Sequence, residues 1–256
     1  CWHTFPEQPA QFAPMPEMLD PRLAEALSER GIDRLYSHQA EAVKHALAGR
    51  DLTVVTPTAS GKSLCYHLPV IQSILANPQA RALFLFPTKA LSQDQFSDLY
   101  ALTGKLNAGI KVYTFDGDTP DSARRAIRSA GQIVITNPDM LHSGILPHHT
   151  LWIKLFENLR WIVIDEIHTY RGVFGSHVAN VMRRLKRICD FYRSQPQFIC
   201  CSATIANPGQ LAQELTGRKM EMVATNGAPR GRKTIIFYNP PVVNAELGIR
   251  RSSVKE

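Results

Sequence analysis

The amino-acid sequence predicts an α/β fold, a mostly parallel sheet with helices on both faces. Short apolar runs such as "ALFLF" and "QIVIT" show no polar alternation, which is typical of strands buried on both faces of a parallel sheet. Most of these runs are followed by a stretch with helical periodicity. The length of 256 residues, 44% of them hydrophobic, is enough for one large core, and by length alone for two small domains.

The N-terminal region is expected to be extended at first and then helical. Prolines at positions 6, 9, 14 and 16 do not suit a helix, so this opening should run extended over a surface. The segment 20–31 predicts a short amphipathic helix with Asp20 as its N-cap, Pro21 at its first position and Gly31 at its end.

Strands and helices then alternate along most of the chain. We expect strands at 51–55, 82–86, 110–115, 132–136, 160–165 and 197–204. We expect helices at 62–75, 90–103, 120–130, 176–193 and 209–217.

A domain boundary is expected near residues 225–233. Glycine, proline and charge cluster there without apolar periodicity, and a strand-like pattern resumes at 234–243. The predicted organisation is an N-terminal extension with the first helix (1–30), one α/β domain (31–225), and a linker with the start of a truncated further domain (226–256).

Composition favours a soluble intracellular protein. No stretch reaches the roughly 18 uninterrupted apolar residues of a membrane span, and the N-terminus lacks the features of a signal peptide. We therefore expect a cytoplasmic location, at the nucleoid if the source is bacterial, and no membrane partner. The net charge of +7, from 29 Lys and Arg against 22 Asp and Glu, favours a polyanionic partner.

The cysteines are expected to be reduced and mostly in the core. They show neither a metal-binding pair nor a disulfide pattern, and they are Cys1, Cys65, Cys189, Cys200 and Cys201.

The segment "TPTASGKS", residues 56–63, ends like a phosphate-binding loop. It follows an apolar run and opens a helix, so backbone N–H groups, Lys62 and Ser63 could meet phosphates and Mg²⁺. The strict pattern has glycine where this chain has Thr56, so the loop should be more open than that pattern implies. The alternative is an ordinary N-capped helix.

Two further segments carry polar residues at the ends of expected strands. "WIVIDEIH" ends in Asp165, Glu166 and His168, and a carboxylate pair there could hold Mg²⁺ and orient or deprotonate the attacking water. "SAT" ends the expected strand at 197–204 with Ser202 and Thr204. Taken alone, the first is more typical of a solvated turn and the second of a helix cap.

Taken together and in order, these segments resemble motifs of superfamily 2 helicases of the DEAD/DEAH-box type. "TPTASGKS", "PTKAL", "TNPDML", "DEIH" and "SAT" match motifs I, Ia, Ib, II and III. "LYSHQAEAV", "FPTKALSQDQ", "YRGVFGSHVANVMRRLKRIC" and "GAPRG" look closest to the YprA-like branch, that of mitomycin repair factor A. The resemblance covers nearly the whole chain and implies the N-terminal RecA-like domain of an ATP-dependent DNA helicase linked to DNA repair.

The resemblance also implies roles for individual residues. ATP would be bound by Gln39, which matches the adenine-reading glutamine, and by the phosphate loop, Thr58, Ala59, Ser60, Gly61, Lys62 and Ser63. The catalytic group would be Lys62, Asp165, Glu166 and His168, with Mg²⁺ on Ser63 and Asp165. His168, Ser202 and Thr204 would couple the nucleotide state to nucleic-acid binding. The alternative for Gln39 is a polar residue on the exposed side of a helix.

Motifs Ia and Ib are candidate contacts to the backbone of one nucleic-acid strand. The residues are Thr88, Lys89, Thr136 and Asn137, whose short polar side chains and single lysine suit phosphate contacts without base recognition. The alternative is loop and helix capping. The run "RRLKR" at 183–187 is most simply the solvated face of a helix whose Val181, Leu185 and Ile188 point inward.

Two classes of function follow from these observations. The first is the ATPase half of a helicase, with single-stranded DNA or an unwinding duplex and a second RecA-like domain of the same parent chain as partners. The alternatives are an RNA-dependent ATPase, or a module that binds nucleotide or nucleic acid without hydrolysis. Lys62, Asp165 and Glu166 are all present, which favours the first class.

Overall fold

A computed structural model describes residues 2–251 of the chain, which form two compact units. The larger unit spans 12–227, and the smaller one combines the described residues 2–11 and 228–251. Cys1, one of the predicted reduced cysteines, lies outside the described residues.

The centre of the larger unit is a seven-stranded sheet in which every pairing is parallel. In spatial order its strands are β10 (Glu221–Val223), β4 (Leu52–Val55), β9 (Gln197–Ser202), β8 (Leu159–Ile164), β5 (Arg81–Leu85), β7 (Ile133–Thr136) and β6 (Val112–Thr114). Strands were expected at each of these positions except β10, and the predicted fold class is confirmed. Because the strands are parallel, all of their carboxyl ends lie at one edge of the sheet.

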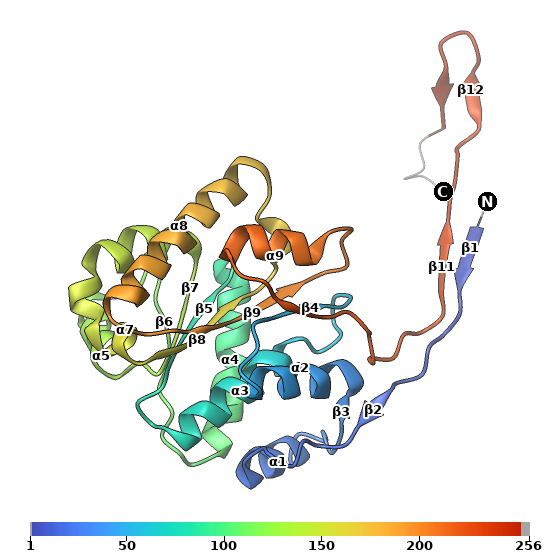
Figure 1. Ribbon diagram of the computed structural model, residues 1–256. Coiled ribbons are helices and arrows are strands. Elements are labelled where there is room, and N and C mark those ends of the chain that lie inside the picture. The colour runs from blue at the N-terminus through green and yellow to red at the C-terminus, as the bar shows by residue number, and fades with distance from the viewer. Residues whose placement is uncertain (1, 252–256) are drawn as a thin grey trace. The chain divides into compact units, whose positions relative to one another are not determined.

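Helices cover both faces of this sheet (Figure 1). One face carries α1 (Pro21–Ser28), α2 (Ser37–Leu47), α3 (Ser63–Ala76) and α4 (Lys89–Lys105). The other carries α5 (Asp121–Ala130), α6 (Pro138–Met140), α7 (Ile153–Glu157), α8 (Gly172–Phe191), α9 (Pro208–Thr216) and the short turns η1 (Leu141–Ile145), η2 (Leu146–Trp152) and η3 (Ile167–Thr169). The turns and short helices of 138–157 were not predicted from the sequence.

The position of β5 in the sheet explains why polar and apolar residues do not alternate along its sequence. Phe84 packs in the core under α1 to α4, while Leu83 and Leu85 pack in the core under α5 to α9. All five residues of the strand are buried. Both faces of the strand therefore require apolar side chains, as the sequence pattern predicts.

The first helix begins as expected. The side chain of Asp20 accepts a hydrogen bond from the Arg22 amide, Pro21 is the first helical residue, and Gly31 follows the helix with a φ of +75°. Leu23 and Leu27 belong to the same core as α2 to α4. The contacts of α1 therefore place it within the larger unit, whereas the sequence grouped it with the N-terminal extension.

The N-terminal opening is extended, as predicted, and contributes to both units. In the larger one, β2 (Phe12–Ala13) pairs antiparallel with β3 (Leu35–Tyr36). In the smaller one, β1 (Trp2–Phe5) pairs antiparallel with β11 (Lys233–Ile236), and β12 (Val242–Asn244) pairs with β13 (Ile249–Arg250).

The cysteines at 65, 189, 200 and 201 are free and buried, as predicted. Among residues 2–251, no helix is long and apolar enough to cross a membrane.

Candidate nucleotide site and nucleic-acid edge

The sheet brings the sequence motifs together in an order that differs from their order in the chain. "TPTASGKS" follows β4, "SAT" begins at the last residue of β9 and "DEIH" follows β8, and these three strands are neighbours. "PTKAL" follows β5 and "TNPDML" begins at the last residue of β7, and β5 and β7 are the next two strands in the sheet. The nucleotide motifs thus share one half of the edge, and the candidate nucleic-acid motifs share the other half.

The loop between β4 and α3 is held by bonds within itself. Nζ of Lys62 donates to the carbonyl oxygens of Thr56 and Pro57, each at 3.0 Å. Ala59 and Gly61 take the left-handed conformation, with φ of +62° and +76°. The Lys62 side chain is 8% exposed, so the ammonium lies inside the loop rather than in solvent.

Thr56 takes the place of the expected glycine without needing left-handed backbone. Its side chain is buried, and its hydroxyl lies 2.6 Å from the hydroxyl of Ser60, within hydrogen-bond distance. The buried threonine side chain therefore links the start of the loop to Ser60. The loop thus has an internal contact at the position where the strict phosphate-loop pattern has glycine.

Gln39 is buried beside this loop rather than on an exposed helix face. Its Oε1 accepts from the Tyr36 amide at 2.9 Å, and its Nε2 donates to the Gly61 carbonyl at 2.8 Å. Gly61 has a φ of +76°, which side chains rarely adopt, and a Cβ there would lie 2.6 Å from Nε2 of Gln39, so the position favours glycine. The exposed alternative for Gln39 is wrong, because only 3% of its surface is accessible.

A cavity of about 520 Å³ opens next to Gln39. Its lining includes Gly61 and Ser63 from the loop and two aromatic rings, Phe12 and Tyr36. These rings stack with their centroids 5.4 Å apart. The cavity offers an aromatic wall, a buried amide and the N-terminus of α3, which suits a flat polar ring joined to phosphates.

Asp165 accepts hydrogen bonds from its neighbour in the chain and from a side chain of α3. Oδ1 accepts from the Glu166 amide at 2.8 Å, and Oδ2 accepts from the Tyr66 hydroxyl at 3.0 Å. Tyr66 is fully buried in α3, one helical turn after Lys62, so it ties the strand end to the helix of the phosphate loop. The same hydroxyl lies 2.9 Å from Oε1 of Gln95, which lines the cavity.

The environment of Asp165 opposes its negative charge. Burial raises the pKa of its carboxyl, and the neighbouring carboxylate of Glu166 raises it further. The hydrogen bonds from the Glu166 amide and from Tyr66, and the charge of Lys62, lower that pKa only in part. A buried carboxylate in this position favours a cation as an additional partner.

Glu166, His168 and the residue after β9 form one hydrogen-bonded chain. Nε2 of His168 lies 3.1 Å from Oε2 of Glu166, and Nδ1 of His168 accepts from the Ala203 amide at 3.2 Å. Because Nδ1 accepts, the proton of the neutral ring lies on Nε2, which donates it to Glu166. Glu166 itself has a left-handed φ of +52°.

Ser202 and Thr204, the other two residues of the predicted coupling group, differ in burial. Ser202 is buried, and its hydroxyl donates to the Ala203 carbonyl at 2.7 Å. Thr204 is exposed. Ser202 therefore bonds to the carbonyl of Ala203, the residue whose amide bonds to His168, whereas Thr204 is exposed in the same loop.

The four candidate nucleic-acid residues are not equally placed. Lys89 is exposed and pairs with Asp118. Thr88 caps α4 by accepting from the Leu91 amide at 3.3 Å, and Asn137 caps α6 by accepting from Met140 at 2.8 Å. These two side chains perform the capping role that was the alternative.

Thr136 requires a correction. It is 2% exposed, and its hydroxyl donates to the Phe115 carbonyl at 2.6 Å. It is the last residue of β7, where its side chain points into the protein and links β7 to the end of β6. In this structure Thr136 supports the edge rather than contacting a nucleic acid.

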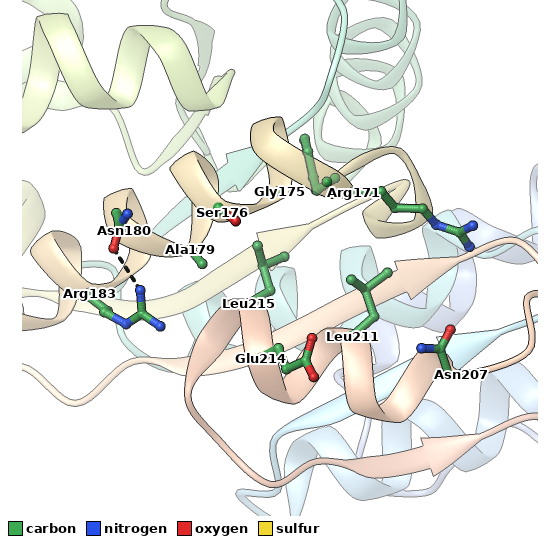
Figure 2. A pocket seen from close by; sticks show the side chains of 12 residues that line it. Arg171, Gly175, Ser176, Ala179, Asn180, Arg183, Asn207, Leu211, Glu214 and Leu215 are labelled. Atoms are coloured by element: carbon green, nitrogen blue, oxygen red, sulfur yellow. Dashed lines mark hydrogen bonds between the residues drawn. The ribbon is translucent and has the colours of Figure 1, made fainter.

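A groove of about 530 Å³ lies between α8 and α9, after the "SAT" segment. Figure 2 shows Arg171, Ser176, Asn180 and Arg183 on the α8 side and Asn207, Leu211 and Glu214 on the α9 side. The guanidinium of Arg183 donates to the Asn180 side chain at 2.7 Å within α8. This groove carries charges of both signs and none of the predicted site residues.

Sequence reasoning missed Tyr66, Phe12 and Tyr36. The position of Tyr66, one turn after Lys62 in a helix, was the signal that could have placed it beneath the loop. Phe12 lies in the proline-rich opening, far from Gln39 in sequence, and only the pairing of β2 with β3 brings it beside Tyr36.

Comparison with known proteins shows the family of the chain. The DEAD/DEAH box helicase family matches residues 36–211. The chain is 60% identical to the uncharacterized ATP-dependent helicase YprA of Bacillus subtilis, covering 100% of this chain and 34% of that protein. It is 42% identical to the ATP-dependent helicase hrq1 of Schizosaccharomyces pombe, covering 94% of this chain and 23% of hrq1. The chain thus spans about a third or less of these relatives.

A solved structure is similar over the whole chain. The DUF1998 helicase MrfA bound to DNA and AMPPNP superposes with a TM-score of 0.96 at 60% identity, covering 100% of this chain and 35% of MrfA. The fold is RecA-like. The chain belongs to the DEAD/DEAH box helicase family, and within it to the YprA-like branch.

Proposed function

We propose that this chain is the ATP-binding and ATP-hydrolysing first motor domain of an ATP-dependent DNA helicase that acts in DNA repair. The observation that carries the proposal is the position of Lys62, Asp165 and Glu166. They follow β4 and β8 at the same edge of the sheet, and the "SAT" loop of β9 lies between them. The names of YprA and hrq1 as ATP-dependent helicases, and the DNA and AMPPNP bound to MrfA, support it.

ATP is proposed to lie across the cavity and the phosphate loop. The adenine would enter the cavity beside Gln39 and the aromatic rings of Phe12 and Tyr36. The phosphates would meet the loop amides and the N-terminus of α3. Lys62 would then exchange its loop carbonyl partners for phosphate oxygens, which are stronger acceptors of a charged hydrogen bond.

The residues also fit Mg²⁺. Asp165 offers a buried carboxylate whose charge is unfavourable without a cation, and Ser63 offers a hydroxyl at the start of α3. Both are oxygen ligands, which this ion prefers, and water and phosphate oxygens usually complete its shell. When bound, the ion neutralises charge on the phosphates during transfer.

Asp165→Asn is expected to stabilise the fold while removing Mg²⁺-dependent ATP affinity. The oxygen of the amide can still accept from the Glu166 amide, and its NH2 group can donate to the Tyr66 hydroxyl, which keeps Gln95 as an acceptor. No buried charge remains, so thermal unfolding at pH 7 should show a gain of about 0.5–2 kcal/mol. The pKa of Asp165 is raised in the folded protein relative to about 3.9 for an unfolded chain. Ionisation of Asp165 therefore destabilises the wild-type fold, and this destabilisation grows as the pH rises above about 3.9. The gain should therefore vanish in acid. Equal stability of wild type and Asp165→Asn at pH 7 would contradict the claim that a buried charge on Asp165 destabilises the fold.

Hydrolysis is proposed to depend on Glu166. Its carboxylate follows Asp165 directly and accepts a hydrogen bond from His168, which in turn accepts from the amide of Ala203. Glu166 would accept the proton of the attacking water. The chain from Glu166 through His168 to the end of β9 gives a direct route by which a change at the nucleotide could move the "SAT" loop.

DNA is proposed to lie along the β5 and β7 half of the edge. Lys89 is the exposed cation at this position, and Thr88 and Asn137 fix the starts of the helices that face it. These groups suit the phosphate backbone and would not distinguish bases. The full-length protein should show ATPase activity that rises with single-stranded DNA; stimulation by RNA alone would exclude the DNA assignment.

The isolated chain is expected to bind single-stranded DNA weakly, to hydrolyse ATP slowly and to unwind nothing. Unwinding by this family is proposed to need a second RecA-like domain, which would supply an arginine finger worth about 10³- to 10⁵-fold in rate. A strand-displacement assay checks this. Processive unwinding by residues 1–256 alone would refute the half-motor proposal.

Lys89→Ala should make DNA binding by this chain less sensitive to salt. Each phosphate contact on a single strand contributes about 0.7 to the log–log slope, so the slope should fall by about that amount. Lys105→Ala is the matched control, because Lys105 is at the opposite end of α4 and pairs with Glu29. Equal slopes for wild type and Lys89→Ala would exclude Lys89 as a contact.

A further inference from the structure

One line of side chains along helix α8 combines exposed aromatic rings with an arginine and a histidine, which is unusual for a helix face that packs in a core. The residues at alternating spacings of three and four are Phe174, His177, Val181, Arg184, Ile188 and Phe191. This spacing places them in one line along the helix. Val181 is buried, yet Phe174 is 42% exposed and Phe191 is 72% exposed, so both ends of the stripe present an aromatic ring to solvent.

The stripe forms one wall of a continuous groove, here named the α8 groove. Two adjoining cavities of about 410 and 450 Å³ lie between α8 and the segment 138–149, and both are lined by Arg184 and Arg187. The opposite wall includes His142, Pro147 and His149. From Phe174 to Phe191 the groove is about 25 Å long, at about 1.5 Å per helical residue.

The α8 groove is basic. Arg184 and Arg187 line it in the middle, and Asp139 is the one acidic side chain among the described residues that line it. Nη1 of Arg184 lies 3.4 Å from Nδ1 of His142 and 3.5 Å from its carbonyl oxygen, so the guanidinium reaches across to the opposite wall. Positive charge between aromatic rings is the combination that binds a polyanion carrying flat bases.

The position of the α8 groove connects it to the candidate DNA edge. Its first lining residues, Pro138 and Asp139, follow Asn137 directly at the end of β7. At the other end, Phe191 and Tyr192 pack edge to face at 4.9 Å, and Tyr192 bonds to His149 at 2.9 Å. The aromatic end is thus held in place before any ligand binds.

We propose that the α8 groove binds single-stranded DNA as it leaves the β5 and β7 edge. This inference rests on the proposed function and extends its DNA path to a surface outside the helicase motifs. Arg184 and Arg187 contact phosphates, while Phe174 and Phe191 stack on bases. The length of the groove matches several nucleotides, within the range of single-strand binding sites.

The test is fluorescence anisotropy with a labelled 20-nucleotide oligo-dU and the whole chain. Arg184→Ala combined with Arg187→Ala should weaken binding and lower the log–log salt slope by about 1.4, two contacts of about 0.7 each. The matched control is Arg183→Ala combined with Lys186→Ala. It removes the same charge from α8, but neither residue lines the groove, and Arg183 faces α9 instead (Figure 2). Equal losses in the two double variants would overturn the proposal.

Stacking is tested separately at Phe191. Phe191→Ala should weaken binding about 5- to 100-fold, as expected for one lost stacked base, and Phe191→Trp should restore it. The emission of Phe191→Trp, after subtraction of the wild-type signal, should be quenched by oligo-dU. Wild-type affinity for Phe191→Ala, or no quenching while DNA is bound, would assign the groove to another occupant such as a protein segment and overturn the proposal.

Two further measurements separate this inference from the proposed function. All groove variants should bind ATP–Mg²⁺ as wild type does, by calorimetry, because the groove contains no residue of the nucleotide site. If the chain binds ATP–Mg²⁺ but binds no oligonucleotide at low salt, the groove proposal fails while the nucleotide site stands.

Discussion

Lys62→Ala is expected to weaken the binding of ATP–Mg²⁺ by about 10- to 100-fold. The ammonium is 8% exposed inside the loop, and it is the cation that the loop itself places at the N-terminus of α3. A hydrogen bond to a charged group contributes about 1.5–3 kcal/mol, and alanine removes it together with the charge. Isothermal calorimetry on the chain in Mg²⁺ measures the change.

The same substitution also removes the two bonds that Lys62 makes to the carbonyls of Thr56 and Pro57. A loss of affinity could therefore come from a disordered loop. Thermal unfolding of Lys62→Ala, and a second variant, Lys62→Met, which keeps the length of the side chain without the charge, separate the two causes. Lys89→Ala is the control for general loss of positive charge. ATP affinity equal to wild type in both Lys62 variants would refute the phosphate-loop assignment.

The strands could be predicted because their environment restricts their composition. A parallel strand covered on both faces admits few polar residues, so β5, β7, β8 and β9 are visible as apolar runs. Strand β10 is three residues long and partly exposed at the edge of the sheet, so it lacks this signal. The irregular segment 138–157 has no single period, because short helical turns of different kind follow one another there.

The site could be predicted as a set of residues but not as an arrangement. The strand order β4, β9, β8 places the "SAT" loop between the phosphate loop and Asp165, although it comes last in the chain. That order depends on packing between distant segments, which local patterns do not encode. The contact from His168 to Ala203 follows from it.

Two individual residues show the limit of position-by-position inference. Thr136 lies in a motif that suits nucleic-acid contact, yet as the last residue of β7 its side chain is directed into the protein. A shift of one residue along a strand reverses the direction of the side chain, and sequence alone does not fix where the strand ends. Tyr66 was missed for the opposite reason, since a tyrosine within an apolar helix resembles an ordinary core residue.

Glu166→Gln is expected to lower the DNA-stimulated ATPase rate of the full-length protein by about 10²- to 10⁴-fold while ATP still binds. The amide has nearly the shape of the carboxylate, and its oxygen can still accept from Nε2 of His168, so the link to Ala203 should persist. What the amide loses is the ability to take a proton from water, and loss of a general base typically has this effect on rate. ATP affinity should not fall, because Lys62, Asp165 and Ser63 are unchanged.

Steady-state hydrolysis with saturating single-stranded DNA, and calorimetry with ATP–Mg²⁺, measure the two quantities on the same preparation. Glu157→Gln is the matched control, since Glu157 is exposed at the end of α7, before β8, and makes no contact with the site. A second comparison, His168→Ala, removes the link to Ala203 but leaves the carboxylate, so it should weaken the response of the rate to DNA more than the basal rate. Hydrolysis by Glu166→Gln at the wild-type rate would exclude Glu166 as the base, because an amide cannot accept that proton at neutral pH.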